Sequence, residues 1–237
     1  MHSGRTFFPM YANSRAITTR QLAPHESLES RLKRMMAAPW QRPYAQHSIA
    51  AFAGAERLLQ AYQPDFPSGL ILDSCCGVGL STRQLAQAFP SHLVIGVDRS
   101  ADRLSRDHGP LPGNALLVRA DLCDFWRLAL EAGWQPERHY LLYPNPYPKA
   151  GHLKRRWQGH PVFPTLMALG GRLELRSNWD IYVQEFAQAI AIVTGQPAPE
   201  VEPHDPQNQF LTPFEKKYHA SGQTLWRCTA ELPYRGA

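Results

Sequence analysis

The sequence has only four cysteines, and none of them stands in a pattern that would hold a metal or a disulfide framework. Cys75, Cys76, Cys123 and Cys228 form no C-x-x-C pair, and no histidine stands at zinc-ligand spacing from them. Free thiols are typical of a reducing compartment. We therefore expect a cytoplasmic protein without a bound metal.

Long apolar runs are missing as well. No stretch approaches the ~18 consecutive apolar residues that a membrane helix needs, and the N-terminus lacks the apolar segment of a secretory signal. The first 24 residues carry Arg5, Arg15 and Arg20 but no acidic residue. A transit peptide would share this composition, but a flexible basic arm is the simpler interpretation.

The remaining composition is that of an ordinary globular chain. Of the 237 residues 43% are hydrophobic and 19% are charged, which suits one α/β domain with terminal extensions. We predict an N-terminal basic arm and helix over residues 1–47, a single domain over 48–237, and a monomer or homodimer. The net charge of +5 weakly favours a polyanionic partner.

Strands and helices alternate from residue 70 onward. Helices are expected before that point at 25–36 and 48–62, with Pro39 and Pro43 between them. We predict strands at 70–72, 93–97, 115–118, 140–143 and 172–175, and helices at 80–89, 100–107, 122–132 and 182–193. Such alternation predicts an α/β fold with a mostly parallel, doubly wound sheet. A last strand at 224–232 is expected to be an antiparallel edge strand.

The run LILDSCCGVGLSTRQLA at residues 70–86 predicts a ligand-binding turn. Gly77 and Gly79 allow a sharp turn and close approach of a ligand, and the following helix offers free N–H groups. Asp98 and Asp121 end the next two strands, where carboxylates can accept ribose hydroxyls or meet an adenine edge. A plain strand-to-helix turn and ordinary helix caps are the structural alternatives.

Asp73 in this loop indicates which nucleoside ligand binds. A carboxylate there would repel a pyrophosphate but would suit the ammonium of a methionine moiety, which favours S-adenosylmethionine over a dinucleotide. The loop resembles the D/E-x-G-x-G-x-G segment of Rossmann-like class I methyltransferases, with cysteine at the first glycine. The resemblance implies these cofactor-binding residues: Asp73, Cys75, Gly77, Gly79, Asp98, Arg99, Asp121 and Leu122.

The run YPNPYPKAGHLKRRWQG at residues 143–159 follows the fourth predicted strand. It concentrates positive charge beside two aromatic side chains, which suits the phosphates and bases of an RNA strand. A solvated charged loop is the alternative. The residues concerned are Lys149, Lys154, Arg155 and Arg156, with Tyr147 and Trp157.

Three motifs together resemble bacterial tRNA (guanine-N7)-methyltransferases. Residues 143–159 are similar to the F-x-D-P-W-P-K…H…K-R-R segment of that family, and 211–228 to its T-x-F/Y-E closing motif. SNWDIYVQEF is a weaker match to T-D-x-x-x-Y, and the resemblance spans roughly residues 65–232. It implies a tRNA substrate, with Asn145 and Tyr147 orienting the base in a catalytic role. The implied substrate-binding residues are Lys149, His152, Lys154, Arg155, Arg156, Asn178, Thr212 and Glu215.

The segment 212–215 has two interpretations, which are not exclusive, because a glutamate can cap the helix in the free protein and rotate to bind a ligand. Thr, Pro and Glu at these positions form a helix-start box, which is a structural role. The resemblance implies that Thr212 and Glu215 hold the guanine, and a carboxylate can accept hydrogen bonds from guanine N1–H and its amino group.

Asn145 departs from the family, which has an acidic residue there. Guanine N7 needs no base to remove a proton, so positioning could supply most of the rate, but a carboxylate would stabilise the charge that develops on guanine. Asn145-Pro146-Tyr147 also resembles the N/D-P-P-Y/F/W motif of enzymes that methylate exocyclic amines. Methylation of an exocyclic amine and a non-catalytic RNA-binding role therefore stay as alternatives. Asn178 also stands where the family has an acidic residue, which indicates a diverged relative.

Overall fold

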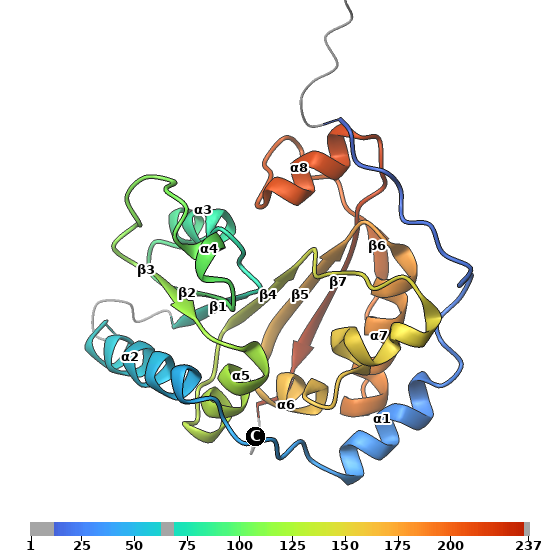
Figure 1. Cartoon of the computed structure of the whole chain (residues 1–237), viewed down its shortest axis with the longest axis horizontal. Helices are drawn as coiled ribbons and strands as arrows, with labels where there is room; N and C mark the ends of the chain where they lie inside the picture. Colours follow the sequence, from blue (N-terminus) through green and yellow to red (C-terminus); the bar gives the residue numbers. More distant parts are fainter. Residues whose placement is uncertain (1–11, 63–68, 235–237) are drawn as a thin grey trace, which may run out of the picture.

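The computed structural model describes residues 12–62 and 69–234, and within these ranges seven strands form one sheet in the order β3-β2-β1-β4-β5-β7-β6 (Figure 1). The parallel strands are β1 (Leu70–Ser74), β2 (Leu93–Asp98), β3 (Ala115–Arg119), β4 (Arg138–Leu142) and β5 (Gly171–Ser177). β7 (Trp226–Leu232) pairs antiparallel to β5, and β6 (Val201–Pro203) pairs antiparallel to β7. The predicted fold class is confirmed.

One detail of the sheet differs from the prediction. The strand predicted at the edge, β7, lies between β5 and β6, and the short β6 forms the antiparallel edge. β6 has only three residues and ends on Pro203. Because proline lacks an amide hydrogen, this segment carries little strand signal.

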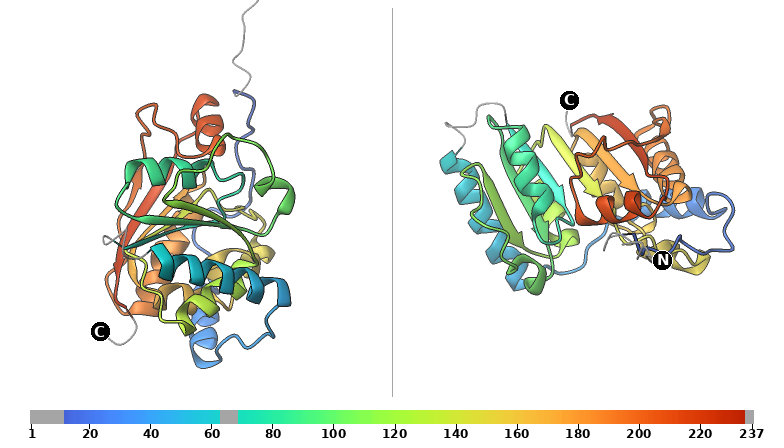
Figure 2. Two further views of the ribbon diagram at one scale, coloured as in Figure 1. Left: turned by 90° about the vertical axis from the view of Figure 1, so that its left-hand side faces the viewer. Right: turned by 90° about the horizontal axis from the view of Figure 1, so that it is seen from above.

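Helices cover the sheet on both faces (Figure 2). They are α1 (Leu28–Ala37), α2 (Gln46–Tyr62), α3 (Leu80–Ala88), α4 (Ala101–Leu104), α5 (Leu122–Glu131), α6 (Phe163–Ala168), α7 (Asp180–Thr194) and α8 (Pro213–Ala220). Two short 3₁₀ helices, η1 (Ala150–Arg155) and η2 (Trp157–Gly159), follow β4. The helix predicted at 100–107 is shorter in the structure, since α4 ends at Leu104 and Ser105 is its C-cap. The sequence analysis did not predict α6, η1 or η2.

Alternate residues of the central strands bury into two separate cores. Leu70 and Leu72 of β1 lie in the larger core with α1, α2 and α5 to α7, whereas Ile71 lies in the smaller core with α3. Strands buried on both faces have nearly continuous apolar sequences. This burial explains the short apolar runs that predicted the strands.

The strand order places the loops after β1 to β4 along one edge of the sheet. The chain moves outward from β1 through β2 to β3 and then returns to β4 on the other side of β1. In open α/β sheets such a reversal leaves a crevice beyond the carboxyl ends of the strands, where ligands bind. The two motif-bearing loops, after β1 and after β4, are therefore neighbours.

The N-terminal arm is fixed to the domain over its described part. Residues 1–11, with Arg5, lie outside the described residues, whereas Ser14 N–H donates to Ser221 Oγ at 3.0 Å and Thr19 Oγ1 donates to the Pro148 carbonyl at 2.6 Å. The expectation of a flexible arm is wrong for this part. The domain boundary at residue 47 stays a prediction; α1 packs against α7, while α2 packs against α5.

At the start of β5, Gly171 lies close to the backbone of Pro136, and Gly195, which has a similar φ, provides a control for this contact. Gly171 has φ 78°, and a Cβ there would overlap the Pro136 carbonyl oxygen; Gly195 has φ 72°, but a Cβ there meets nothing within 4 Å. Gly171→Ala should lower the free energy of unfolding by roughly 3 kcal/mol, and Gly195→Ala by only about 1 kcal/mol. Urea denaturation measures both, and equal losses would contradict the steric account.

Candidate active site

Asp73 lies under the loop that joins β1 to α3. Its side chain is 0% exposed, and its Oδ2 accepts hydrogen bonds from Ser81 Oγ and Thr82 Oγ1, both at 2.6 Å. The carboxylate thereby ties the end of β1 to the first turn of α3. Oδ1 is equally buried and has no hydrogen-bond partner among the described residues.

The burial of Asp73 also changes its charge. Desolvation raises the pKa of its carboxyl to about 6, because the hydrogen bonds from Ser81 and Thr82 only partly offset the loss of water and Asp98 lies near. A positively charged group beside Oδ1 would supply the missing partner and stabilise the ionised form. The residues present thus fit the ammonium of a methionine moiety, as the sequence predicted.

The loop itself has a backbone that few residue types adopt. Cys75, Gly77 and Gly79 have φ values of 64°, 61° and 77°. This left-handed region favours glycine, which explains why the resemblance expects glycine at Cys75. A Cβ at Gly79 would press on the Leu117 side chain, whereas a Cβ at Gly77 would meet nothing within 4 Å. Gly77 therefore faces open space, where a ligand has room to approach.

Asp98 joins this loop to the end of β2. Its Oδ2 accepts from the Gly77 amide at 3.1 Å, and its Oδ1 accepts from the Ser100 amide at 2.8 Å. The Arg103 guanidinium lies 3.7 Å away. Each carboxylate oxygen has a further lone pair, so the predicted contact with ribose hydroxyls is compatible with this arrangement and stays a prediction.

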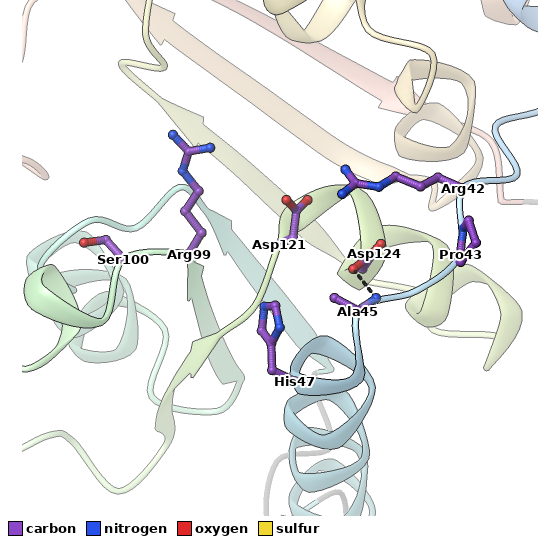
Figure 3. Close-up of a pocket in the computed structure, with 8 residues that line it drawn as sticks. All are labelled: Arg42, Pro43, Ala45, His47, Arg99, Ser100, Asp121 and Asp124. Carbon is purple, nitrogen blue, oxygen red and sulfur yellow. Dashed lines mark hydrogen bonds between the residues drawn. The ribbon is translucent and has the colours of Figure 1, made fainter.

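A pocket of about 540 Å³ lies beside the loops after β2 and β3 (Figure 3), and no residue of the loop after β1 is among its lining. Arg99 and Asp121, which line it, were both predicted to bind the cofactor. The segment between α1 and α2 forms another wall of the pocket, and the sequence analysis did not predict this wall. Ala45 N–H of that segment donates to Asp124 Oδ2 at 3.1 Å and so holds the segment against α5. The lining residues are Arg42, Pro43, Ala45, His47, Arg99, Ser100, Asp121 and Asp124.

Asp121 and Leu122 have structural roles at the start of α5. Asp121 is the N-cap, and its Oδ1 accepts from the Cys123 amide at 2.8 Å. The Leu122 side chain is buried in the larger core and does not line the pocket. Its predicted contact with the cofactor stays a prediction, for which its backbone is available.

The turn after β4 carries the predicted base-orienting residues. Tyr143 and Tyr147 both have left-handed backbones, with φ 52° and 43°. Asn145 is exposed, and its Oδ1 accepts from the Tyr147 amide at 3.3 Å. The turn thus presents Asn145 to solvent at the carboxyl edge of the sheet, next to the loop after β1.

Part of the predicted basic run lies open on the surface. Lys149, Lys154 and Arg155 are exposed, and the Arg155 guanidinium lies 5.9 Å from the centre of the Tyr147 ring. His152 makes an edge contact with the same ring at 6.2 Å. Partial desolvation and the nearby positive charges, Arg155 first, lower the pKa of His152, which favours its neutral form at neutral pH.

Arg156 does not belong to this exposed set. Its side chain is 0% exposed, and its Nη1 donates to both carboxylate oxygens of Glu185 at 2.7 Å. The prediction that Arg156 contacts phosphate is therefore wrong for this structure. Sequence reasoning missed Glu185, because nothing local marks a buried partner on α7.

Glu215 is buried as well. Thr212 caps α8 and accepts from the Glu215 amide at 3.0 Å, as the helix-start box predicted. Glu215 Oε1 accepts from Tyr143 Oη at 2.9 Å and from Arg176 Nη1 at 2.8 Å, and Oε2 accepts from the Leu211 amide at 2.7 Å. Its side chain is 0% exposed.

The charge state of Glu215 follows from these partners. Burial alone would raise the pKa of this carboxyl, but the His204 ring nitrogen, 3.4 Å from Oε1, and the charge and hydrogen bond of Arg176 together lower it to about 2. Glu215 is thus a fully paired structural carboxylate in this structure, and its expected contact with a guanine base stays a prediction. Arg176, its main ionic partner, was not predicted.

Asn178 and Thr212 lie at the same end of the sheet as Asn145. Asn178 follows β5, and its Nδ2 donates to Gln223 Oε1 at 2.8 Å. This bond joins the end of β5 to the turn after α8. Both residues are partly exposed, and their contact with a substrate stays a prediction.

The comparisons with known proteins agree with this geometry. The family described as "Putative methyltransferase" matches residues 68–228, so the chain belongs to that methyltransferase family. A tRNA (guanine-N(7)-)-methyltransferase of Ectopseudomonas mendocina (strain ymp) is 28% identical over 171 residues, which are 63% of this chain and 67% of the relative. A protein of the same name from Leifsonia xyli subsp. xyli is 25% identical over 201 residues, 74% and 85% of the two chains.

Solved structures show the same fold. One titled as an antibiotic-related methyltransferase aligns with TM-score 0.57 and 15% identity, over 75% of this chain and 94% of its own. A 16S rRNA (adenine(1408)-N(1))-methyltransferase from Catenulisporales acidiphilia, solved with its cosubstrate SAM, aligns with TM-score 0.51 and 17% identity, over 75% and 92%. The predicted resemblance, the class I fold and S-adenosylmethionine as cofactor are confirmed, at the low identity of a diverged member.

Over residues 12–62 and 69–234, none of the helices combines the length and the apolar character needed to span a bilayer.

The raised pKa of Asp73 predicts how cofactor affinity depends on pH. Protonation below pH 6 removes the charge that would face the ammonium, so S-adenosylmethionine should bind about tenfold more weakly at pH 5 than at pH 8. Isothermal titration of the wild-type protein and of Asp73→Asn measures this, and the variant should bind weakly with no such dependence. The exposed control Asp102→Asn should titrate like the wild type, and a flat wild-type profile would remove Asp73 from the cofactor site.

Proposed function

We propose that this protein transfers the methyl group of S-adenosylmethionine to N7 of a guanine in tRNA. One observation carries the proposal: the Asn145–Lys149 turn lies at the carboxyl end of β4, beside the cofactor loop after β1 and flanked by exposed cations. The relatives named tRNA (guanine-N(7)-)-methyltransferases support the substrate.

The chemistry asks little of the protein beyond binding and orientation. When bound, S-adenosylmethionine supplies an electrophilic methyl group on a sulfonium. The lone pair of guanine N7 forms the new bond to that carbon while the carbon–sulfur bond breaks and its electron pair stays on sulfur. No proton leaves, so no general base is needed, and alignment of the two reactants supplies most of the acceleration.

Tyr147 and Asn145 are the residues proposed to orient the base. The Tyr147 ring is partly exposed between Arg155 and His152, and an aromatic ring in that position can stack on a splayed-out base. Asn145 keeps its amide nitrogen available because only its Oδ1 is used by the Tyr147 amide. A side-chain N–H can donate to guanine O6.

Exposed cations around the turn are proposed to bind the RNA backbone. Lys149 ends the turn, Lys154 and Arg155 lie in the following η1, and exposed Arg20 follows Thr19, which is bonded to the turn. Each phosphate contact releases counterions, so tRNA affinity should fall steeply with salt.

Nucleoside mass spectrometry tests the function directly. Unmodified tRNA transcripts incubated with the purified protein and S-adenosylmethionine should yield 7-methylguanosine. Appearance of an N-methylated exocyclic amine instead would favour the amine-methylating alternative. Binding of tRNA without any methylated nucleoside would favour the non-catalytic one.

Asn145→Asp introduces the acidic residue that the resemblance to the tRNA (guanine-N7)-methyltransferase family implies at this position. A carboxylate beside the base stabilises the positive charge that develops on guanine, so the transfer rate should rise about tenfold, with cofactor affinity unchanged. Asn208→Asp is the control, because it adds the same charge in an exposed turn elsewhere. Single-turnover transfer measures both, and an unchanged or lower rate in Asn145→Asp would contradict the assigned role.

A further inference from the structure

The buried guanidinium of Arg156 has an unusual set of partners. Its Nη1 donates hydrogen bonds to both carboxylate oxygens of Glu185, and both side chains are 0% exposed. Gln158 Nε2 also donates to Glu185 Oε2 at 2.9 Å. A buried ion pair is stable only when its remaining donors and acceptors are satisfied, so the other nitrogens of Arg156 must also find acceptors.

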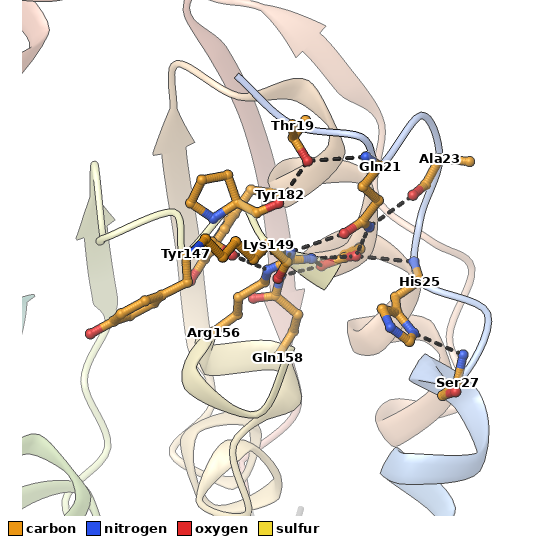
Figure 4. A network of polar contacts seen from close by, with 12 residues as sticks. Thr19, Gln21, Ala23, His25, Ser27, Tyr147, Lys149, Arg156, Gln158 and Tyr182 are labelled. Carbon is orange, nitrogen blue, oxygen red and sulfur yellow. Dashed lines mark hydrogen bonds and ion pairs between the residues drawn. The ribbon is translucent and has the colours of Figure 1, made fainter. Parts of the chain in front are cut away.

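Those acceptors are carbonyl groups of the turn after β4 (Figure 4). Arg156 Nε and Nη2 donate to the Tyr147 carbonyl at 3.2 and 3.1 Å, and Nη2 also reaches the Lys149 carbonyl at 3.3 Å. Tyr147 has φ 43°, a conformation that a bulky residue adopts only when its surroundings enforce it. The hydrogen bonds from Arg156 restrain the Tyr147 carbonyl, and the Asn145 side chain restrains the Tyr147 amide.

The N-terminal segment completes the arrangement. We call residues 12–27 the strap. Gln21 of the strap accepts from Arg156 Nη2 at 2.9 Å through its Oε1 and donates to Glu185 Oε1 at 2.6 Å through its Nε2. The His25 amide donates to the same Glu185 oxygen at 3.0 Å, and Thr19 bonds the Pro148 carbonyl. The strap is thus bonded both to the ion pair and to the turn that the ion pair holds.

We propose that Arg156 is a positioning residue for Tyr147, and that Gln21 of the strap is its second support. Arg156 then acts on the base through the backbone of the turn and makes no phosphate contact. The proposal rests on the proposed function in one respect, namely that Tyr147 contacts the target base.

Gln21→Leu tests the support without removing either buried charge. Hydrogen exchange of the peptides covering residues 143–156 should be about tenfold faster than in the wild type, because the bonds of Gln21 to Arg156 and to Glu185 are both lost. In tRNA methylation kcat should fall about tenfold, while KM and cofactor affinity stay within about twofold. Thr18→Ala, an exposed change on the same strap, should match the wild type in every measurement.

Salt dependence separates positioning from phosphate contact. Arg156→Met with Glu185→Gln removes both buried charges together, which avoids an uncompensated carboxylate. The slope of log Kd for tRNA against log salt should be unchanged in this double variant, whereas Arg155→Met should lower it by about 1. If the double variant does not fold, Gln21→Leu still decides the proposal.

Wild-type exchange and transfer in Gln21→Leu, or a lowered salt slope in the double variant, would overturn the proposal. Failure of the proposed function gives a different result. A wild-type protein that methylates no tRNA, combined with faster exchange in Gln21→Leu, would keep Arg156 and Gln21 as supports of the turn and remove only the assigned substrate.

Discussion

The ion pair between Arg156 and Glu185 joins four parts of the chain at one buried point. The strap, the turn after β4, η2 and α7 all bond to one of these two side chains. Desolvation makes such a pair costly unless every donor is matched, and here the matching groups are supplied by segments far apart in the sequence. The shape of the turn that carries Asn145 and Tyr147 therefore depends on residues outside it.

Asp73 and Glu215 are both buried carboxylates, but their different partners shift their pKa values in opposite directions. Asp73 has only neutral hydroxyl donors, so burial dominates and its pKa rises to about 6. Glu215 has Arg176 beside it, and its pKa falls to about 2. Asp73 retains an unsatisfied oxygen that a cation can stabilise, whereas Glu215 is already neutralised. Of the two, Asp73 is suited to a ligand and Glu215 to holding α8 against the sheet.

Local patterns predicted the sheet, the glycine loop and the acids at the strand ends, because strand burial and turn geometry act over a few residues. They failed where the partner is distant. Arg156 looks like Arg155 in sequence, but its counter-ion in the buried site, Glu185, lies 29 residues later. The pocket wall formed by Arg42, Pro43 and Ala45 belongs to a segment for which the sequence predicted only a break between two helices. Glu215 was correctly placed in a helix-start box, but its ionic partner Arg176 lies on β5.

The strap makes the site a composite of both ends of the chain. Ser14 exchanges hydrogen bonds with the turn after α8 at Ser221 and Gln223, while Gln21 reaches the pair formed by Arg156 and Glu185. The segment 143–156 is consequently not a self-contained cassette. A chimera built from it would have to carry the strap and the matching face of α7 as well, wherever the recipient scaffold lacks a counter-ion for the arginine.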